Sequence, residues 1–265
     1  MVKGQDEARI GLGAEKNLVE LLNNNVILKE KILYCLRKIG IKIDNISYAE
    51  RPSRKKLVKT DILLCSAPTD DGCIGISLKT VKKTAKGFHS LDRRRLEEWR
   101  SLLGMDEEVF SVFKESILRV ARNRREVFIR PNDREKIKNF INKNIYIILK
   151  EIFLKNEYDL LKVLAVLDLR KSNRKLYLLN INKLIDFIIE NYSIDFSRKG
   201  IIIIKVKNKP LITIQRKGGN GKHVKRYRKT DWEHPGNQLQ FKIKPILLVE
   251  LIKNYYNSII CELSI

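Results

Sequence analysis

Apolar residues recur along this chain at two different spacings, which together predict a mixture of helices and strands. Spacings of three and four residues predict helices over residues 7–22, 28–39, 107–120, 133–143, 181–191 and 248–260, and another from a cap at Ser90 or Asp92 to Leu103. Shorter apolar runs, alternating or continuous, predict strands over residues 41–49, 61–65, 73–78, 145–149, 161–167, 176–179, 200–206, 211–215 and 239–243.

The most informative stretch is residues 59–80, which predicts a β-hairpin. Two apolar runs, 61–65 and 73–78, flank a polar turn rich in aspartate with a proline and a glycine. Paired strands bring their ends together, so Asp61, at the start of the first strand, and Lys79, at the end of the second, are expected to face one cleft. A carboxylate that holds a divalent cation, beside an ammonium group, is the minimal chemistry for cutting a phosphodiester. The alternative is that both residues are solvated strand ends.

The composition is that of a globular protein. The chain has 265 residues, of which 43% are hydrophobic and 32% charged, enough for one large or two modest domains. A basic stretch, residues 119–130, ends near Asn132, and we place the boundary there, giving domains of residues 1–131 and 132–265.

No stretch reaches the roughly 18 apolar residues of a membrane span, and the first residues lack the apolar core of a signal peptide. A cytoplasmic location without membrane contact is therefore expected. In that compartment the four cysteines are expected to be reduced and to act as small buried hydrophobic residues; they are Cys35, Cys65, Cys73 and Cys261.

Charge indicates the class of partner. The chain has 54 Lys and Arg against 31 Asp and Glu, a formal net charge of +23. An excess of this size predicts a polyanionic partner, most often nucleic acid. The alternative is an AT-rich genome, which raises the number of lysines, but it would not reduce the number of acidic residues. Three lysines follow directly after the hairpin and add basic charge next to it: Lys82, Lys83 and Lys86.

A second informative stretch is the polar loop of residues 216–238. It combines glycines, basic residues and aromatic rings, and strands are predicted on both sides of it. Arginine can pair with guanine, and asparagine or glutamine with adenine, through two hydrogen bonds in the major groove. The residues that stand at the two ends of this loop are Gln215, Arg216, Asn237 and Gln238. The sequence therefore favours DNA recognition here, and a disordered surface loop is the alternative.

These motifs together resemble the small type II restriction endonucleases of the MspI/HinP-like family, in the PD-D/ExK nuclease superfamily. Thr60 and Asp61 followed by Ser77-x-Lys79 resemble the active-site motif, with Thr60 at the place of a proline and Ser77 at that of the second acid. Further segments resemble the family in the same order: GLGAEK at residues 11–16, KGF at 86–88, LDR at 91–93, TIQRKGGN at 213–220 and NQLQFK at 237–242.

The resemblance implies an α/β fold, in which a mixed β-sheet flanked by helices forms a restriction-endonuclease-like core beside a second, smaller α/β recognition domain. It implies Mg²⁺ as cofactor, held by Asp61 and the Leu78 carbonyl, with Ser77, Lys79 and Glu15 as the other catalytic residues. DNA contacts are expected from the basic loop and the recognition segment, at Lys82, Lys83, Lys86, Ser90, Arg93, Gln215, Arg216, Lys217, Gly218, Gly219, Asn220, Asn237 and Gln238.

The function implied is that of a type II site-specific deoxyribonuclease. It would hydrolyse double-stranded DNA at a short GC-rich palindrome, with GCGC as the predicted target, and serve in restriction–modification defence beside a cognate DNA methyltransferase. The chain would act as a monomer or a weak homodimer. Two alternatives stay open: a structure- or damage-specific nuclease of the same fold, and a non-catalytic nucleic-acid-binding protein.

Overall fold

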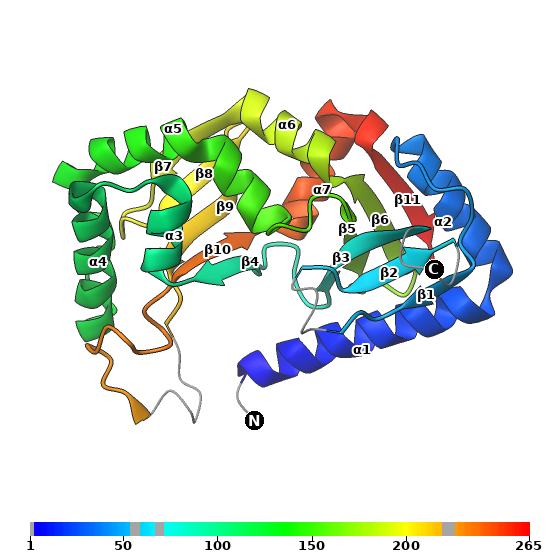
Figure 1. The fold of residues 1–265 in the computed structure, drawn as a ribbon, viewed down its shortest axis with the longest axis horizontal. Helices are drawn as coiled ribbons and strands as arrows, with labels where there is room; N and C mark the ends of the chain where they lie inside the picture. The colour runs from blue at the N-terminus through cyan, green and yellow to red at the C-terminus, as the bar shows by residue number, and fades with distance from the viewer. Residues whose placement is uncertain (1–2, 54–58, 67–71, 219–225) are drawn as a thin grey trace. The chain divides into compact units, whose positions relative to one another are not determined.

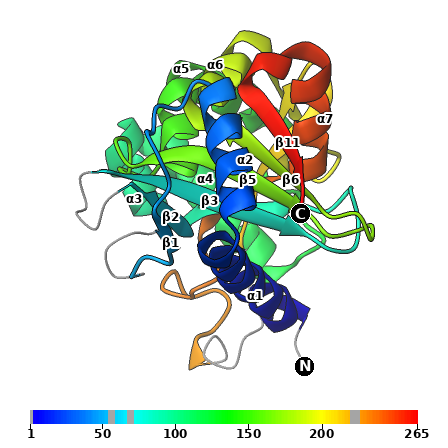
Figure 2. The same ribbon diagram turned by 90° about the vertical axis from the view of Figure 1, so that its right-hand side faces the viewer.

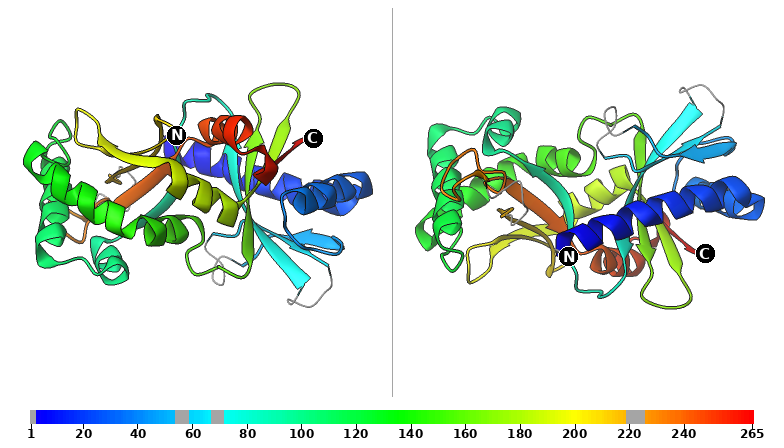
Figure 3. Two further views of the ribbon diagram at one scale, coloured as in Figure 1. Left: turned by 90° about the horizontal axis from the view of Figure 1, so that it is seen from above. Right: turned by 90° about the horizontal axis from the view of Figure 1, so that it is seen from below.

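Two β-sheets, each with its own helices, form the computed structural model of this protein (Figure 1). The structure describes residues 3–53, 59–66, 72–218 and 226–265. The chain forms two compact units: unit 1 comprises residues 1–87, 153–187 and 244–265, and unit 2 comprises residues 88–152 and 188–243. Figure 3 shows the N-terminal helices in blue and the C-terminal elements in red, all of which belong to unit 1.

Unit 1 is built on a six-stranded mixed sheet with the order β1-β2-β3-β5-β6-β11. Neighbouring strands are antiparallel except for β3 and β5, which are parallel. The strands are β1 (Tyr48–Glu50), β2 (Ile62–Cys65), β3 (Cys73–Val81), β5 (Leu161–Asp168), β6 (Lys175–Asn180) and β11 (Ile260–Ser264).

Alternation along the strands decides which face of this sheet is covered by the N-terminal helices. Ile74, Ile76 and Leu78 of β3 belong to one buried cluster with apolar residues of α1 (Lys3–Asn24) and α2 (Val26–Lys38). Side chains at odd positions of β3 point to the opposite face of the sheet. Figure 2 shows α1 and α2 beside the strands. Helix α7 (Pro245–Tyr255) contacts β3, β5 and β11.

Unit 2 is built on a five-stranded antiparallel sheet with the order β4-β10-β9-β8-β7. Its core includes Trp99 and Phe241, whose ring centroids lie 4.9 Å apart. Strands of this unit are β4 (His89–Arg94), β7 (Tyr192–Phe196), β8 (Ile202–Val206), β9 (Lys209–Arg216) and β10 (Leu239–Ile243). Its helices are α3 (Leu96–Leu103), α4 (Glu107–Arg122) and α5 (Arg134–Phe153), and α6 (Ile181–Asn191) crosses the boundary between the units.

The structure differs from the sequence prediction at several elements. The strand predicted over residues 145–149 is part of helix α5, and the strand predicted over 41–49 is reduced to β1. The helix expected from Ser90 or Asp92 is preceded by strand β4, which pairs with β10. The closing helix predicted to Ile260 ends at Tyr255, and strand β11 follows it; strand β7 was not predicted.

The two compact units do not follow the single expected boundary between residues 131 and 132. That position lies inside unit 2, and both units contain segments from both halves of the chain. The reason is the parallel pairing of β3 with β5, which returns residues 161–168 to the sheet formed by the N-terminal strands.

The cysteines also differ from expectation, since none of the four is a free thiol. Cys35 pairs with Cys261, and Cys65 pairs with Cys73, as two disulfides. Their burial was predicted correctly for Cys35, Cys65 and Cys261, which are at most 5% exposed.

Among the helices that the structure describes, none has the length and apolar character that crossing a membrane requires.

Candidate active site

The predicted hairpin is present in unit 1 as strands β2 and β3. Ile62 pairs with Ile76, and Cys65 with Cys73, in an antiparallel register. Asp61 lies one residue before β2, and its backbone N–H donates to the Ile76 carbonyl at 2.8 Å. Because β2 begins at Ile62, opposite Ile76, while β3 continues to Val81, the β3 residues after Ile76 extend past the start of their partner strand. The turn residues 67–71 of this hairpin lie outside the described residues.

The Asp61 carboxylate binds the part of β3 that extends past the first residue of β2. Asp61 Oδ2 accepts the Leu78 N–H at 2.6 Å. In a β-strand the N–H and C=O of one residue point to the same side. The Leu78 carbonyl therefore points to the same edge of β3 as the Asp61 carboxylate, as expected if the two share a cation.

Ser77 connects the carboxylate to the ammonium group. The Lys79 Nζ donates to Ser77 Oγ at 3.2 Å, and Ser77 Oγ donates to Asp61 Oδ2 at 3.4 Å. Ser77 is 4% exposed, whereas Asp61 and Lys79 are half-buried. The hydroxyl thus bridges the two charged groups, and the structure brings together the three residues that the sequence had placed at neighbouring strand ends.

The donors at this site fit a magnesium ion that is bound only partly by protein. Both hydrogen bonds to Asp61 use Oδ2, so Oδ1 has no hydrogen-bond partner among the described residues. Across the same residues, no group of three or more His, Cys, Asp or Glu side chains is arranged to hold a metal. Mg²⁺ keeps several waters and commonly takes one or two carboxylates plus substrate phosphates. One carboxylate and one backbone carbonyl are compatible with that mode.

Two other groups predicted from the sequence also belong to unit 1. Glu15 lies on α1, which packs against β1 and β3, and its Oε2 pairs with Arg51 at 3.0 Å. The lysines that follow β3 are exposed to solvent, as a phosphate-contacting role requires; they are Lys82, Lys83 and Lys86.

Strands β4, β10 and β9 of unit 2 carry a row of polar side chains. Gln240 pairs in register with Arg93 on one side and with Gln215 on the other, so the three side chains share one face of the sheet. The Gln240 amide also donates to the Ser90 hydroxyl at 3.3 Å. Gln240 was not among the predicted site residues, although the alternation of LQFKI at 239–243 would have placed it on the polar face.

Arg216 and Asn237 lie on the other, buried side of this region. Asn237 is 0% exposed, and its Oδ1 accepts from Arg216 Nε at 2.8 Å. Its Nδ2 donates to the carbonyls of Lys229 and Asp231. With its amide fully engaged, Asn237 acts here as a support for the loop, and the base contact expected of it has no accessible group.

Arg216 is 8% exposed, and burial, with the nearby Arg124 second, lowers its pKa. His234 is also buried, and its Nδ1 accepts the Gly236 N–H at 2.9 Å. Burial, followed by the charge of Arg216, lowers the pKa of His234. Arg216, His234 and Asn237 therefore form a compact internal cluster beneath the end of β9.

The remaining residues of the recognition segment have mixed environments. Lys217 donates to the Pro235 carbonyl at 3.1 Å, and burial, with Arg93 and Arg95 nearby, lowers its pKa. Gly218 has a φ of +65°, a conformation that favours glycine. Gln238 has a buried side-chain oxygen without a hydrogen-bond partner among the described residues. Gly219 and Asn220 lie outside those residues.

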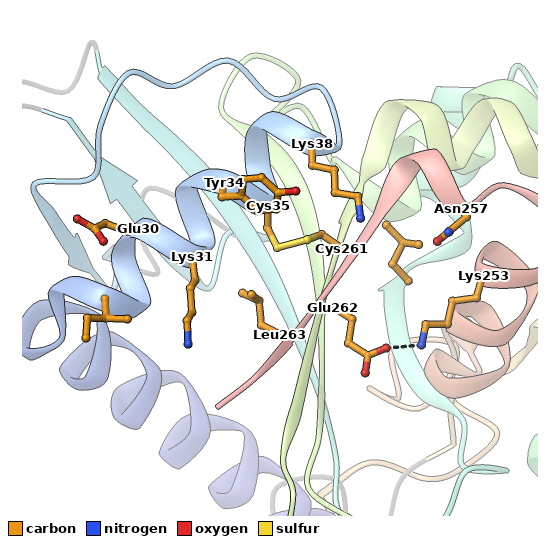
Figure 4. A pocket seen from close by; sticks show the side chains of 12 residues that line it. Glu30, Lys31, Tyr34, Cys35, Lys38, Lys253, Asn257, Cys261, Glu262 and Leu263 are labelled. Carbon is orange, nitrogen blue, oxygen red and sulfur yellow. Dashed lines mark hydrogen bonds and ion pairs between the residues drawn. A yellow bond between two sulfur atoms is a disulfide. The ribbon is translucent and has the colours of Figure 1, made fainter.

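A pocket of about 580 Å³ lies elsewhere in unit 1, between α2, α7 and β11 (Figure 4). The Cys35–Cys261 disulfide lies among its lining residues, and Lys253 pairs with Glu262 there. None of the residues that line it comes from β2 or β3. The pocket is therefore separate from the Asp61–Ser77–Lys79 site.

No protein-family model matches this chain, and no curated protein is similar to it in sequence. A solved structure, that of restriction endonuclease MspI in complex with its cognate DNA, is similar in fold, with a TM-score of 0.52. The similarity covers 91% of this chain and 93% of that one, at 13% sequence identity. The chain therefore has a restriction-endonuclease-like α/β fold, with mixed sheets flanked by helices.

Proposed function

We propose that this protein is a magnesium-dependent, type II site-specific deoxyribonuclease that acts on double-stranded DNA. The observation that carries the proposal is the contact between Asp61, Ser77 and Lys79 where β3 extends past β2. The fold also supports the proposal, because it is similar to that of a restriction endonuclease solved with DNA.

Asp61 and the Leu78 carbonyl would hold the Mg²⁺ ion. When bound, the ion would polarise the scissile phosphate and lower the pKa of a coordinated water. Lys79 would stabilise the negative charge that develops on the phosphoryl oxygens and orient the attacking water. Ser77 would keep the Lys79 ammonium and the Asp61 carboxylate in fixed relative positions through its two hydrogen bonds. Glu15, whose carboxylate pairs with Arg51, is proposed as a further acidic residue on the family resemblance alone.

DNA binding would combine phosphate contacts with base contacts. The net charge of +23 and the exposed lysines after β3 suit the phosphate backbone. For the bases, the polar row of Arg93, Gln240 and Gln215 presents side chains whose chemistry matches guanine and adenine edges. Arg216 lies buried at the end of the strand that carries Gln215, and it would contact a base from there.

The finer features of the proposal follow the family resemblance. The target would be a short GC-rich palindrome such as GCGC, and the enzyme would serve in restriction–modification defence in the cytoplasm beside a cognate DNA methyltransferase. It would act as a monomer or a weak homodimer.

Plasmid DNA with and without Mg²⁺ gives a direct test. A site-specific nuclease should produce discrete linear fragments with Mg²⁺ and none with a chelator. Nicks or a smear would instead indicate a structure- or damage-specific nuclease.

A gel shift without cleavage would indicate a non-catalytic binder. That alternative is favoured by one observation, the neutral hydroxyl of Ser77 at the place of a second acid.

A further inference from the structure

The backbone directly before Asp61 is held by a carboxylate from a distant part of the chain. Glu157 lies between α5 and β5, and it accepts three hydrogen bonds from residues 59 and 60. Its Oε1 accepts the Lys59 N–H at 2.7 Å. Its Oε2 accepts the Thr60 N–H at 2.9 Å and the Thr60 hydroxyl at 2.6 Å.

The turn that carries Glu157 is itself fixed to the sheet. The Leu161 N–H donates to the Glu157 carbonyl, and the Gly75 N–H donates to the Leu160 carbonyl, both at 2.8 Å. The Glu157 carboxylate is therefore connected to β3 and β5 through short backbone hydrogen bonds. Lys59 and Thr60 are only 9% and 5% exposed, so water competes weakly for these bonds.

Gly75 leaves the space that this contact requires. A Cβ added at Gly75 would lie 2.6 Å from Thr60 Oγ1 and 3.2 Å from Leu161 Cα. Any side chain at residue 75 would thus displace Thr60 or the neighbouring strand. The Thr60 hydroxyl therefore fits against β3 only because residue 75 has no side chain.

We propose that Glu157 and Thr60 position the Asp61 carboxylate, with Glu157 acting through the backbone. Glu157 binds residues 59 and 60, directly before Asp61. The backbone N–H of Asp61 itself donates to the Ile76 carbonyl. These bonds fix where the Asp61 side chain begins, and hence the contact of Oδ2 with the Leu78 N–H. The effect on catalysis rests on the proposed nuclease function, whereas the effect on Asp61 does not.

The first test is amide hydrogen exchange by NMR, which needs no activity. Glu157→Gln and Thr60→Val should speed exchange at Leu78, whose N–H is bonded to the Asp61 side chain, by about tenfold. Thr60→Ser keeps the hydroxyl and should restore the slow rate. Glu262→Gln is the matched control, because Glu262 lies on β11, three strands away from β3, and pairs there with Lys175 of β6 and Lys253 of α7. Unchanged Leu78 exchange in both Glu157→Gln and Thr60→Val would overturn the proposal.

The second test is kinetic. Groups that orient a metal ligand typically change activity or metal affinity by about 10–100-fold when they are mutated. Glu157→Gln should therefore lower kcat by that factor and raise the Mg²⁺ concentration needed, with KM for DNA nearly unchanged.

The two tests separate the two proposals. If the wild-type protein does not cut DNA but Leu78 exchange responds as described, the nuclease proposal fails and the positioning of Asp61 stands. If the wild-type protein cuts DNA and Glu157→Gln leaves kcat and Leu78 exchange unchanged, the positioning role is wrong.

Discussion

At the scale of single residues, the most unusual feature of the candidate site is Ser77. A neutral hydroxyl stands at the place of the second acid in the motif that the sequence resembles, and it connects Lys79 to Asp61. The sequence located this residue but not its contacts, because hydrogen-bond partners depend on the register between β2 and β3. The hydroxyl keeps the two charged groups close without adding charge of its own.

Ser77→Ala should therefore slow cleavage, whereas Ser77→Asp should lower the magnesium requirement. Ser77→Ala removes the bridge and should lower the cleavage rate about 10–100-fold, the usual size for groups around a metal ligand. Ser77→Asp adds a hard anionic ligand and should lower the Mg²⁺ concentration at half-maximal rate. Titrating magnesium while following the cleavage rate measures both the maximal rate and the Mg²⁺ concentration at half-maximal rate. Ser66→Ala, directly after β2, is the control. An identical magnesium requirement in all variants would contradict this role.

His234 gives a prediction about pH. Its pKa is lowered in the folded state, so the folded protein keeps His234 neutral at pH values where the unfolded chain binds a proton. The resulting stability is present above the unfolded pKa of about 6.5 and is lost as pH falls below it. Protonation of Nδ1 would also remove the bond from Gly236.

Urea unfolding at pH values from 7.5 to 5.5 measures this effect. The free energy of unfolding should fall with pH by at most about 1.4 kcal/mol per pH unit from this one proton. His234→Gln should flatten the fall, whereas His89→Gln should leave it in place. A fall of the same steepness in His234→Gln would assign the effect to other groups.

At the scale of elements, local pattern predicted the hairpin and most helices, and it failed where a short apolar run fits two spacings or where distant pairing decides. Residues 145–149 are apolar enough for a strand, but Ile145, Ile148, Leu149 and Ile152 follow helical spacing and continue α5. Strand β4 forms because residues 89–94 pair with β10, about 150 positions later. No local signal predicts such a pairing, or the approach of Glu157 to Thr60.

Helix α1 offers a prediction about stability at this scale. Gly13 lies inside the helix, and a Cβ added there would have no neighbour within 4 Å. Alanine is better than glycine in a helix interior by roughly 0.8–1.0 kcal/mol, because glycine loses more backbone freedom. Gly13→Ala should therefore raise the free energy of unfolding by up to that amount. Gly75→Ala, where the added Cβ meets Thr60, should lower it, as measured by urea unfolding; equal effects would contradict both assignments.

At the scale of the whole molecule, the order of motifs predicted the fold, and the nucleic-acid partner expected from the charge stays a prediction. The restriction-endonuclease-like fold is confirmed, whereas the division of the chain into two units is interleaved instead of sequential. The amino-acid composition likewise did not predict that the cysteines form disulfides. Whether cysteines pair depends on which strands and helices bring them together, and 226 positions separate Cys35 from Cys261.

The central claim is that Asp61 and Lys79 cut DNA with magnesium, and single-turnover cleavage of a plasmid with excess protein tests it most directly. Wild-type protein with Mg²⁺ should give discrete fragments. Asp61→Asn and Lys79→Ala should each slow cleavage by about 10²–10³-fold, comparable to losing one charge-stabilising group, while retaining DNA binding. Lys82→Ala, a matched exposed lysine, should mainly weaken binding and lower its salt dependence by about one counterion. Equal rates for wild-type, Asp61→Asn and Lys79→Ala proteins would contradict the account.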